Sequence, residues 1–195
     1  MSETETTPLP VREVDGLTVP QPGTYTVDAS HSELTFSVRH MMVSKVRGRF
    51  NQVAGSIRFA EDLVDSVVEV DIDVASIDTN APDRDAHLKS ADFFDAEQYP
   101  SITFRSTGVR DLKGDSFTLE GDLTVRDVTR PVSFTATYNG AGRNPWGQTV
   151  VGFEGTVELD REDFGLTWNQ ALETGGVLVG KVAKIDIAIE AAGPA

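Results

Sequence analysis

The sequence predicts an all-β domain of about eight antiparallel strands, with one short helix among them. Apolar and polar residues alternate with period two along most of the chain, as in SVVEVDIDVAS (residues 66–76), where valine and isoleucine alternate with glutamate and aspartate. Such alternation is typical of strands with one buried face. Short turn sequences, such as KGD at 113–115 and NG at 139–140, separate the runs and indicate hairpin connections.

The first 22 residues are expected to precede the folded domain as a flexible tail, because they are rich in Ser, Thr and Glu. Five residues that disfavour regular elements are spread along them: Pro8, Pro10, Gly16, Pro20 and Pro22. Leu17 and Val19 are the residues of this segment that could dock on the domain. We therefore assign residues 1–22 to a tail and residues 23–195 to one domain, which is long enough to bury a single core.

Within the domain, eight apolar rows are expected to form strands. The clearest rows lie at residues 34–38, 68–74, 117–125, 132–138, 151–159 and 185–189, and weaker rows lie at 48–59 and 101–109. Several small residues on or near these rows are expected to leave space inside the domain: Gly48, Gly55, Gly121, Ala136 and Gly155.

The interval 76–100 lacks alternation and predicts a short amphipathic helix and a loop. Pro82 suits the first turn of a helix, and His87, Ala91 and Phe94 follow at spacings of four and three. Strands of the predicted kind can close into a barrel or stack as a sandwich. The interrupting helix slightly favours a barrel with a capped mouth, and an eight-stranded barrel can hold one small ligand or be filled by its own side chains.

The composition argues against several classes of protein. A formal net charge of -14 disfavours nucleic acid as a partner, since nucleic-acid binding depends on clustered positive charge. The chain has no cysteine, so disulfides and thiolate metal sites are excluded. No apolar run approaches the roughly 18 residues of a membrane span, and the N-terminal sequence lacks the pattern of a secretory signal. We expect a cytoplasmic protein without stable membrane insertion.

Three histidines are the candidates for chemistry. His31 lies in DASHS (residues 28–32), which contains the residue types of a hydrolase triad, but neighbouring residues on a strand point to opposite faces. His40 is in register with the row at 34–38 and is interpreted as a core residue or as a group that meets a ligand's polar head. The histidine spacings match no common zinc motif, so neither a metal nor a cofactor is expected. A small metal-assisted or His/carboxylate hydrolase using His31, His40 or His87 is the alternative.

Residues 31–50 concentrate positive charge in an acidic chain, with four cations: Arg39, Lys45, Arg47 and Arg49. One interpretation pairs these side chains with the acidic outer face of a neighbouring strand, such as the carboxylates at positions 69, 71 and 73, as individually weak ion pairs. The other places one or two of them at the barrel mouth, where they meet an anionic head group. Met41 and Met42 are either gap-fillers or the lining of an adaptable pocket.

Three separated segments carry a family resemblance. They are YTVDASHSELTFSVRHMMVSKVRGRF (25–50), DAHLKSADFFDAEQYPSITFRS (85–106) and DREDFGLTWN (160–169), the last followed by an apolar strand. Together they resemble the YceI-like family of lipocalin-like, polyisoprenoid-binding proteins, over roughly residues 24–191. The resemblance implies an eight-stranded antiparallel lipocalin-like β-barrel with a short helical segment capping its mouth and an apolar interior that holds a long prenyl chain.

The resemblance also implies which residues line the pocket. FSVRHMM offers Phe36, Val38, His40 and Met42; HLKSADFF offers Leu88, Phe93 and Phe94; ITF offers Phe104; and GLTW offers Trp168. Alternation alone adds Phe134 and Phe153. Arg39 and Lys45 are the candidates for contact with a head group.

The predicted function is the binding of a long polyisoprenoid lipid, such as a prenyl phosphate or a prenylated quinone, for carriage or storage. No catalysis is expected, and a homodimer is a possible assembly. A further alternative is a barrel filled by its own side chains whose surface binds a partner, which predicts an exposed apolar patch instead of a bound lipid.

Overall fold

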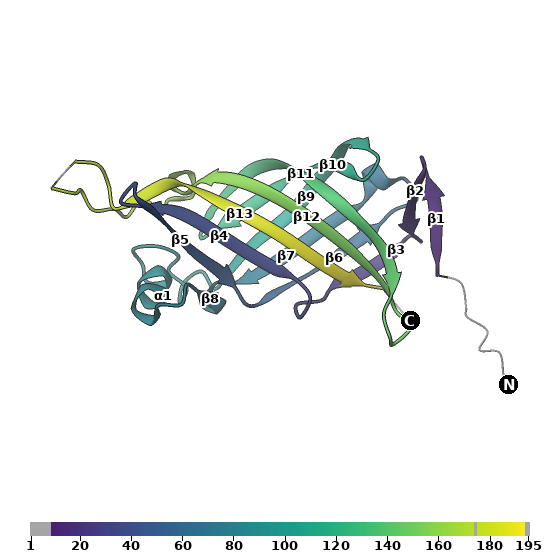
Figure 1. The fold of residues 1–195 in the computed structure, drawn as a ribbon, viewed down its shortest axis with the longest axis horizontal. Helices are drawn as coiled ribbons and strands as arrows, with labels where there is room; N and C mark the ends of the chain where they lie inside the picture. Colours follow the sequence, from purple (N-terminus) through teal and green to yellow (C-terminus); the bar gives the residue numbers. More distant parts are fainter. Residues whose placement is uncertain (1–8, 174, 194–195) are drawn as a thin grey trace.

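The computed structural model describes residues 9–173 and 175–193, whose strands close into an antiparallel β-barrel (Figure 1). The barrel strands are β3 (Gly23–Val27), β4 (Glu33–His40), β5 (Ser44–Phe50), β6 (Val53–Phe59), β7 (Val67–Asp73), β8 (Ile77–Asp78), β9 (Ser101–Lys113), β10 (Ser116–Val125), β11 (Val128–Arg143), β12 (Thr149–Asp160) and β13 (Val179–Ala192). Neighbours in the ring follow the order β12-β11-β10-β9-β7-β6-β3-β13, and the pairing of β13 with β12 closes it. The predicted eight-stranded barrel is therefore confirmed.

Three of the eight strands around the barrel are each divided by a break into two shorter strands, namely β3 and β4, β5 and β6, and β7 and β8. β3 and β4 both pair with β13, and β5 and β6 pair with β4 and β3 in turn. The breaks at residues 51–52 and 74–76 lie side by side, because the Asn51 amide donates to the Ser76 carbonyl at 3.2 Å. The weak apolar row at 48–59 thus belongs to two strands joined at one of these breaks.

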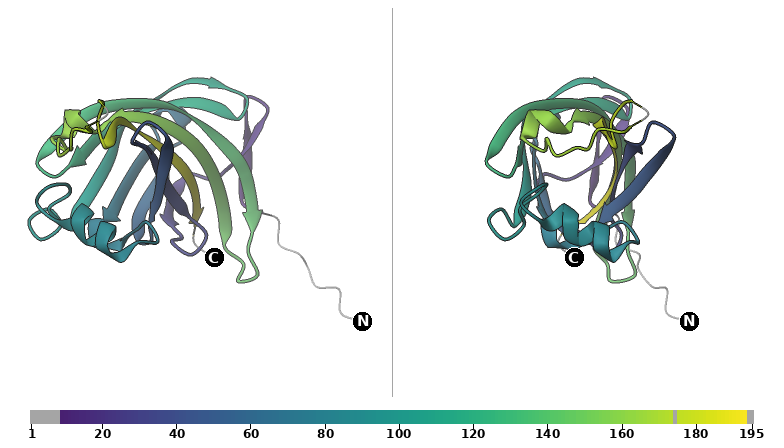
Figure 2. Two further views of the ribbon diagram at one scale, coloured as in Figure 1. Left: turned by 60° about the vertical axis from the view of Figure 1, so that its left-hand side comes forward. Right: turned by 90° about the vertical axis from the view of Figure 1, so that its left-hand side faces the viewer.

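The helix α1 (Pro82–Lys89) begins at the predicted proline and lies along one end of the barrel (Figure 2). It ends before Ala91 and Phe94, which belong to the following turns. The Arg84 side chain ties the helix to the segment before it, since its Nη2 donates to the Thr79 carbonyl at 2.7 Å. The short helix η3 (Arg161–Phe164) and the segment after it lie at the same end.

The prediction of a flexible tail is wrong for residues 11–20. β1 (Val11–Val14) and β2 (Leu17–Pro20) form a hairpin at the barrel end opposite α1 (Figure 1). Val19 is buried in the core, and the Tyr138 hydroxyl donates to the Thr18 carbonyl at 3.1 Å. The hairpin folds because the barrel buries its apolar side, which composition alone does not reveal; residues 1–8 lie outside the described residues.

Three glycines expected to leave space inside the barrel instead lie beneath aromatic rings of neighbouring strands. The pairs are Phe36 over Gly48, Phe104 over Gly121 and Phe134 over Gly155. A Cβ atom would come within 2.5 Å of the ring at Gly48 and 2.4 Å at Gly121, closer than side chains can pack. These glycines therefore let bulky rings lie against the wall.

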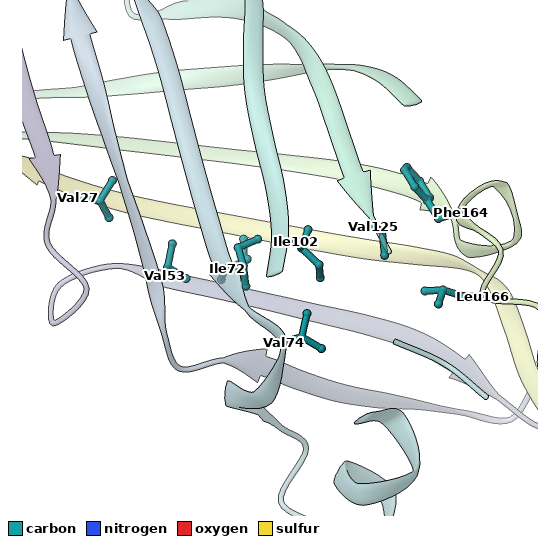
Figure 3. Close-up of a cluster of buried hydrophobic side chains, with 9 residues drawn as sticks. Val27, Val53, Ile72, Val74, Ile102, Val125, Phe164 and Leu166 are labelled. Atoms are coloured by element: carbon teal, nitrogen blue, oxygen red, sulfur yellow. The ribbon is translucent and has the colours of Figure 1, made fainter. Parts of the chain in front are cut away.

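The buried side chains form a lining around the inside of the barrel. One cluster gathers residues of several strands, of η3 and of the segment after it, and Figure 3 labels eight of them: Val27, Val53, Ile72, Val74, Ile102, Val125, Phe164 and Leu166. A second cluster lies at the hairpin end and includes Val19, Tyr25 and Tyr138. The core is thus spread along the wall from one end of the barrel to the other.

Candidate functional site

An elongated apolar cavity of about 460 Å³ runs through the barrel. Its lining includes Leu17 and Val19 of the hairpin at one end, and Leu88 of α1 and Trp168 at the other. The six residue steps from Phe153 to Leu159 on β12 alone span about 20 Å along the strand, or about 15 Å along the barrel axis at a tilt of roughly 40°, so the average cross-section of the 460 Å³ cavity is about 30 Å². Such a shape accommodates one long, thin apolar chain better than a compact ring system.

Ten of the eleven side chains predicted to line a pocket contribute to this cavity. They are Phe36, Val38, His40, Leu88, Phe93, Phe94, Phe104, Phe134, Phe153 and Trp168. The strand residues among them lie on inward rows of β4, β9, β11 and β12, and the others come from α1, the turns after it and the segment after η3. Their contact with a ligand remains a prediction.

The structure contradicts the predicted pocket role of Met42. Its side chain is 63% exposed and does not contribute to the lining. Alternation stops at His40 because Met41 and Met42 have left-handed backbone conformations, with φ of 51° and 60°, and turn the chain from β4 into β5. Lys45 is likewise exposed and outside the lining, since the inward neighbour on its strand is Val46; Arg39, the other head-group candidate, lies in the lining at the mouth.

The α1 end of the cavity carries most of its polar groups. The lining there includes Arg39, His40, Arg84, His87 and Arg161. The carboxylate residue of the lining within the described chain is Glu154, which lies on β12 seven residues before Arg161, or about 23 Å along the chain. This end is therefore positively charged relative to the apolar interior.

Arg161 is a site residue that the sequence reading missed. It continues the inward row of β12 through Val157 and Leu159, and only 6% of the residue is exposed. Its Nε donates to the Gly180 carbonyl at 2.8 Å and its Nη1 to the Leu166 carbonyl, while Nη2 has no partner among the described residues. Burial lowers the pKa of Arg161. The guanidinium joins η3 to the start of β13 at the cavity mouth.

An aromatic cluster forms the rim beside α1. The His87 ring meets Trp168 edge-on at a centroid distance of 4.7 Å and Phe93 at 5.1 Å. His87 Nε2 also lies 2.9 Å from a carboxylate oxygen of Asp92. These contacts fix the imidazole between the cavity and solvent, where it can offer a polar edge to a ligand's head.

The opposite end of the cavity is closed and apolar. Leu17 and Val19 of the hairpin contribute to its lining together with Phe153 and Tyr138. Burial raises the pKa of Tyr138 to about 12, and the Tyr138 hydroxyl donates a hydrogen bond to the Thr18 carbonyl of the hairpin. The far end of a ligand that enters at the α1 end would therefore contact apolar side chains.

His31 lies outside the cavity, in an exposed ion-pair cluster. Its Nδ1 is 2.8 Å from Asp28 and 3.6 Å from Glu190. Hydrogen bonds from Ser30 and His31 lower the pKa of Asp28 to about 2, and the bond with Asp28 raises the pKa of His31.

This cluster does not have the geometry of a hydrolase triad. Ser30 Oγ donates to Asp28 at 2.6 Å and lies 3.3 Å from the same His31 nitrogen that faces Asp28. A triad needs the nucleophile at one imidazole nitrogen and the acid at the other. His40, in the cavity, has no carboxylate within hydrogen-bond distance among the described residues.

The ion pairs expected for the cations of residues 31–50 form with Asp78 of the neighbouring strand β8 and not with the carboxylates at positions 69 and 71. Asp71 and Glu69 pair with Arg105, at 2.9 and 3.9 Å, because β9 and not β5 lies beside that part of β7. Of the four cations, Arg49 has an ion pair within the described chain, with Asp78 at 3.2 Å. Lys45 lies near enough to Asp186 to help lower the pKa of that carboxyl, while Arg39 and Arg47 have no ion pair among the described residues.

Comparison with known proteins agrees with this architecture. The family model described as a YceI-like domain matches residues 25–191. The chain belongs to the YceI-like family. UPF0312 protein SA2479 of Staphylococcus aureus is 39% identical over 171 residues, covering 85% of this chain and 95% of that protein.

Two solved structures share the YceI-like fold. Burkholderia cenocepacia BcnA has a TM-score of 0.73 at 22% identity, covering 84% of this chain and 98% of that one. A polyisoprenoid-binding domain from Saccharophagus degradans has a TM-score of 0.68 at 15% identity, covering 87% of this chain and 98% of that one. At these identities the likeness concerns the fold. Across residues 9–173 and 175–193, no helix has the length and apolar character of a membrane span.

Proposed function

We propose that this YceI-like protein binds a long polyisoprenoid lipid, such as a prenyl phosphate or a prenylated quinone, in the barrel cavity and carries or stores it. The observation that carries the proposal is the shape and polarity of the cavity: long, narrow, apolar, closed at the hairpin and cationic at the α1 end. The description of the Saccharophagus degradans domain as polyisoprenoid-binding supports the same ligand class.

The volume of the cavity suits a prenyl chain of several units. A cavity of about 150 Å³ accommodates the six carbons of benzene, or roughly 25 Å³ per carbon. On this scale 460 Å³ holds about 18 carbons, between three and four isoprene units. Burial contributes about 0.8 kcal/mol per CH₂, so each unit adds about 3–4 kcal/mol before the costs of ordering the chain. Tight binding would then need few polar contacts.

The polar groups define an orientation for the ligand. The tail would lie towards Val19 and Phe153, and the head towards Arg39, His40 and His87. A phosphate would be attracted by the guanidinium of Arg39, whereas a quinone carbonyl would need only a hydrogen-bond donor. Binding makes or breaks no covalent bond, so the proposed role is not enzymatic.

Native mass spectrometry of delipidated protein tests this proposal. With added prenylated quinone or prenyl phosphate, we expect one lipid per chain. Binding of neither lipid would contradict the proposal, and equal binding of a straight-chain fatty acid would reduce it to lipid binding in general. A cytoplasmic location and a homodimer remain predictions from the sequence, which cell fractionation and light scattering would test.

A further inference from the structure

The tip of the β4–β5 hairpin exposes three consecutive apolar side chains. Met41, Met42 and Val43 are 44%, 63% and 84% exposed, respectively. Val177, in the segment before β13, and Val182, on β13, are also exposed. The Met41 amide donates to the Leu178 carbonyl at 2.8 Å, so the tip is attached to this rim. We define the tip as residues 41–43.

The backbone conformation of the tip is unfavourable for the side chains that it carries. Met41 and Met42 both have left-handed φ values, 51° and 60°, and the Val43 amide closes the turn on the His40 carbonyl at 3.1 Å. Asn and Gly are the residues that suit such a turn, because left-handed backbone is unfavourable for larger side chains. Neither turn geometry nor burial therefore explains two methionines here.

Positive charge surrounds the tip, with Lys45 and Arg47 on the outer face of the hairpin and Arg39 exposed at the cavity rim. Residues 34–50 contain Arg39, Lys45, Arg47 and Arg49 and no carboxylate, although the whole chain has a net charge of -14. Arg39 lies directly across from Lys45, and Arg47 follows on the outward side of β5. Among residues 9–173 and 175–193, Asp186 on β13 and Asp78 on β8 are the carboxylates that interact with this group.

We propose that this hairpin docks on the surface of an anionic lipid bilayer, with the tip inserted among the lipids and the cations facing their head groups. Peripheral attachment to membranes combines apolar side chains that enter the interface with Lys and Arg that are attracted to anionic lipids. The net negative charge of the protein acts weakly at this contact, because physiological salt screens exposed charges beyond about 8 Å.

The docked orientation brings the cavity mouth to the bilayer. Leu178 and His40, which flank the tip, both line the cavity. The α1 end would face the membrane while the N-terminal hairpin faces away (Figure 1). A lipid could then enter or leave the barrel without crossing bulk water.

Vesicle flotation with the full chain tests the proposal. We expect the protein to float with mixed phosphatidylcholine and phosphatidylglycerol vesicles at low salt, and to bind less as salt rises or when phosphatidylcholine is used alone. Replacing Lys45 and Arg47 by Gln should weaken partitioning roughly 25-fold, at about fivefold per cation.

The Met41→Asn/Met42→Gly double variant separates docking from folding. These residues suit the turn better, so thermal stability should be unchanged or higher while flotation is lost. Trp146→Ser is the matched control: Trp146 is 74% exposed in the β11–β12 loop at the opposite end of the barrel, and this variant should float normally.

Two results would overturn the proposal. One is failure of the unaltered protein to float with anionic vesicles at low salt. The tip would then be expected to bind a protein partner and not a bilayer. The other is normal flotation of the Met41→Asn/Met42→Gly variant. Neither result bears on lipid binding in the cavity, which native mass spectrometry measures without vesicles.

Discussion

Val157→Phe should shorten the prenyl chain that the cavity accepts. Val157 lies on the inward row of β12 between Gly155 and Leu159, and its side chain lines the cavity. It pairs with Ile185 on β13, so the added ring would lie beside that strand and extend into the cavity. The substitution adds apolar surface to an apolar lining and should leave the barrel folded.

The size of the effect follows from the cavity volume. Phenylalanine has four more carbon atoms than valine, which occupy about 100 Å³ at roughly 25 Å³ per carbon. This is about a fifth of the 460 Å³ cavity and close to one isoprene unit. A ligand that fills the cavity would lose burial of about four carbons, or about 3 kcal/mol, which weakens its Kd roughly 100-fold. A shorter chain that still fits the remaining space should bind as before.

Titration with prenylated quinones of increasing chain length measures this effect. The unaltered protein should gain affinity with each unit until the cavity is full, and Val157→Phe should reach its plateau about one unit earlier. Glu158→Phe is the matched control, because it adds the same ring at the next, exposed position of β12. An unchanged dependence on chain length in Val157→Phe would show that the prenyl chain does not lie in this cavity.

Three further predictions concern the head group, the surface cluster and the hairpin. Arg39→Ala should weaken binding of a prenyl phosphate and spare a neutral prenylated quinone in parallel titrations; equal losses for both ligands would show that Arg39 does not contact the head. His31→Gln should lower the free energy of unfolding most below about pH 6, because a raised folded-state pKa stabilises the protein at low pH and this contribution disappears as the pH rises through it. Asp28 stays ionised over that range, so urea unfolding that gives a pH-independent loss would contradict the assignment. Val19→Ala should cost about 2 kcal/mol in the same assay, since it removes two buried methyl groups at the closed end, and no loss would mean that the N-terminal hairpin does not support the barrel.

The strands could be predicted from the sequence because each strand has one buried apolar face and one solvent-exposed face. Val68, Val70 and Ile72 line the cavity as their alternation indicates, and so do Phe134 and Phe153. Period two is a local property of the chain, so it does not depend on which strands become neighbours. The helix start was equally local, since Pro82 suits a first turn wherever the helix docks.

The features that the sequence did not reveal depend on contacts between distant segments. Phe104 fills the space beside Gly121 from another strand, and Asp71 pairs with Arg105 because β9 lies beside β7. Met42 leaves the predicted row because the left-handed turn ends the alternation. Arg161 could have been found by extending the row of β12 past Leu159, where a buried cation at the cavity mouth interrupts the apolar pattern.

The proposed function requires that the barrel holds a prenyl lipid in its native setting. The most direct test is to purify the protein natively from its own source, extract it with organic solvent, and identify and quantify the released lipid by mass spectrometry. We expect close to one prenyl lipid per chain, with the cavity as its binding site. Protein that yields no lipid, and that also fails to take up prenylated quinone or prenyl phosphate afterwards, would contradict it.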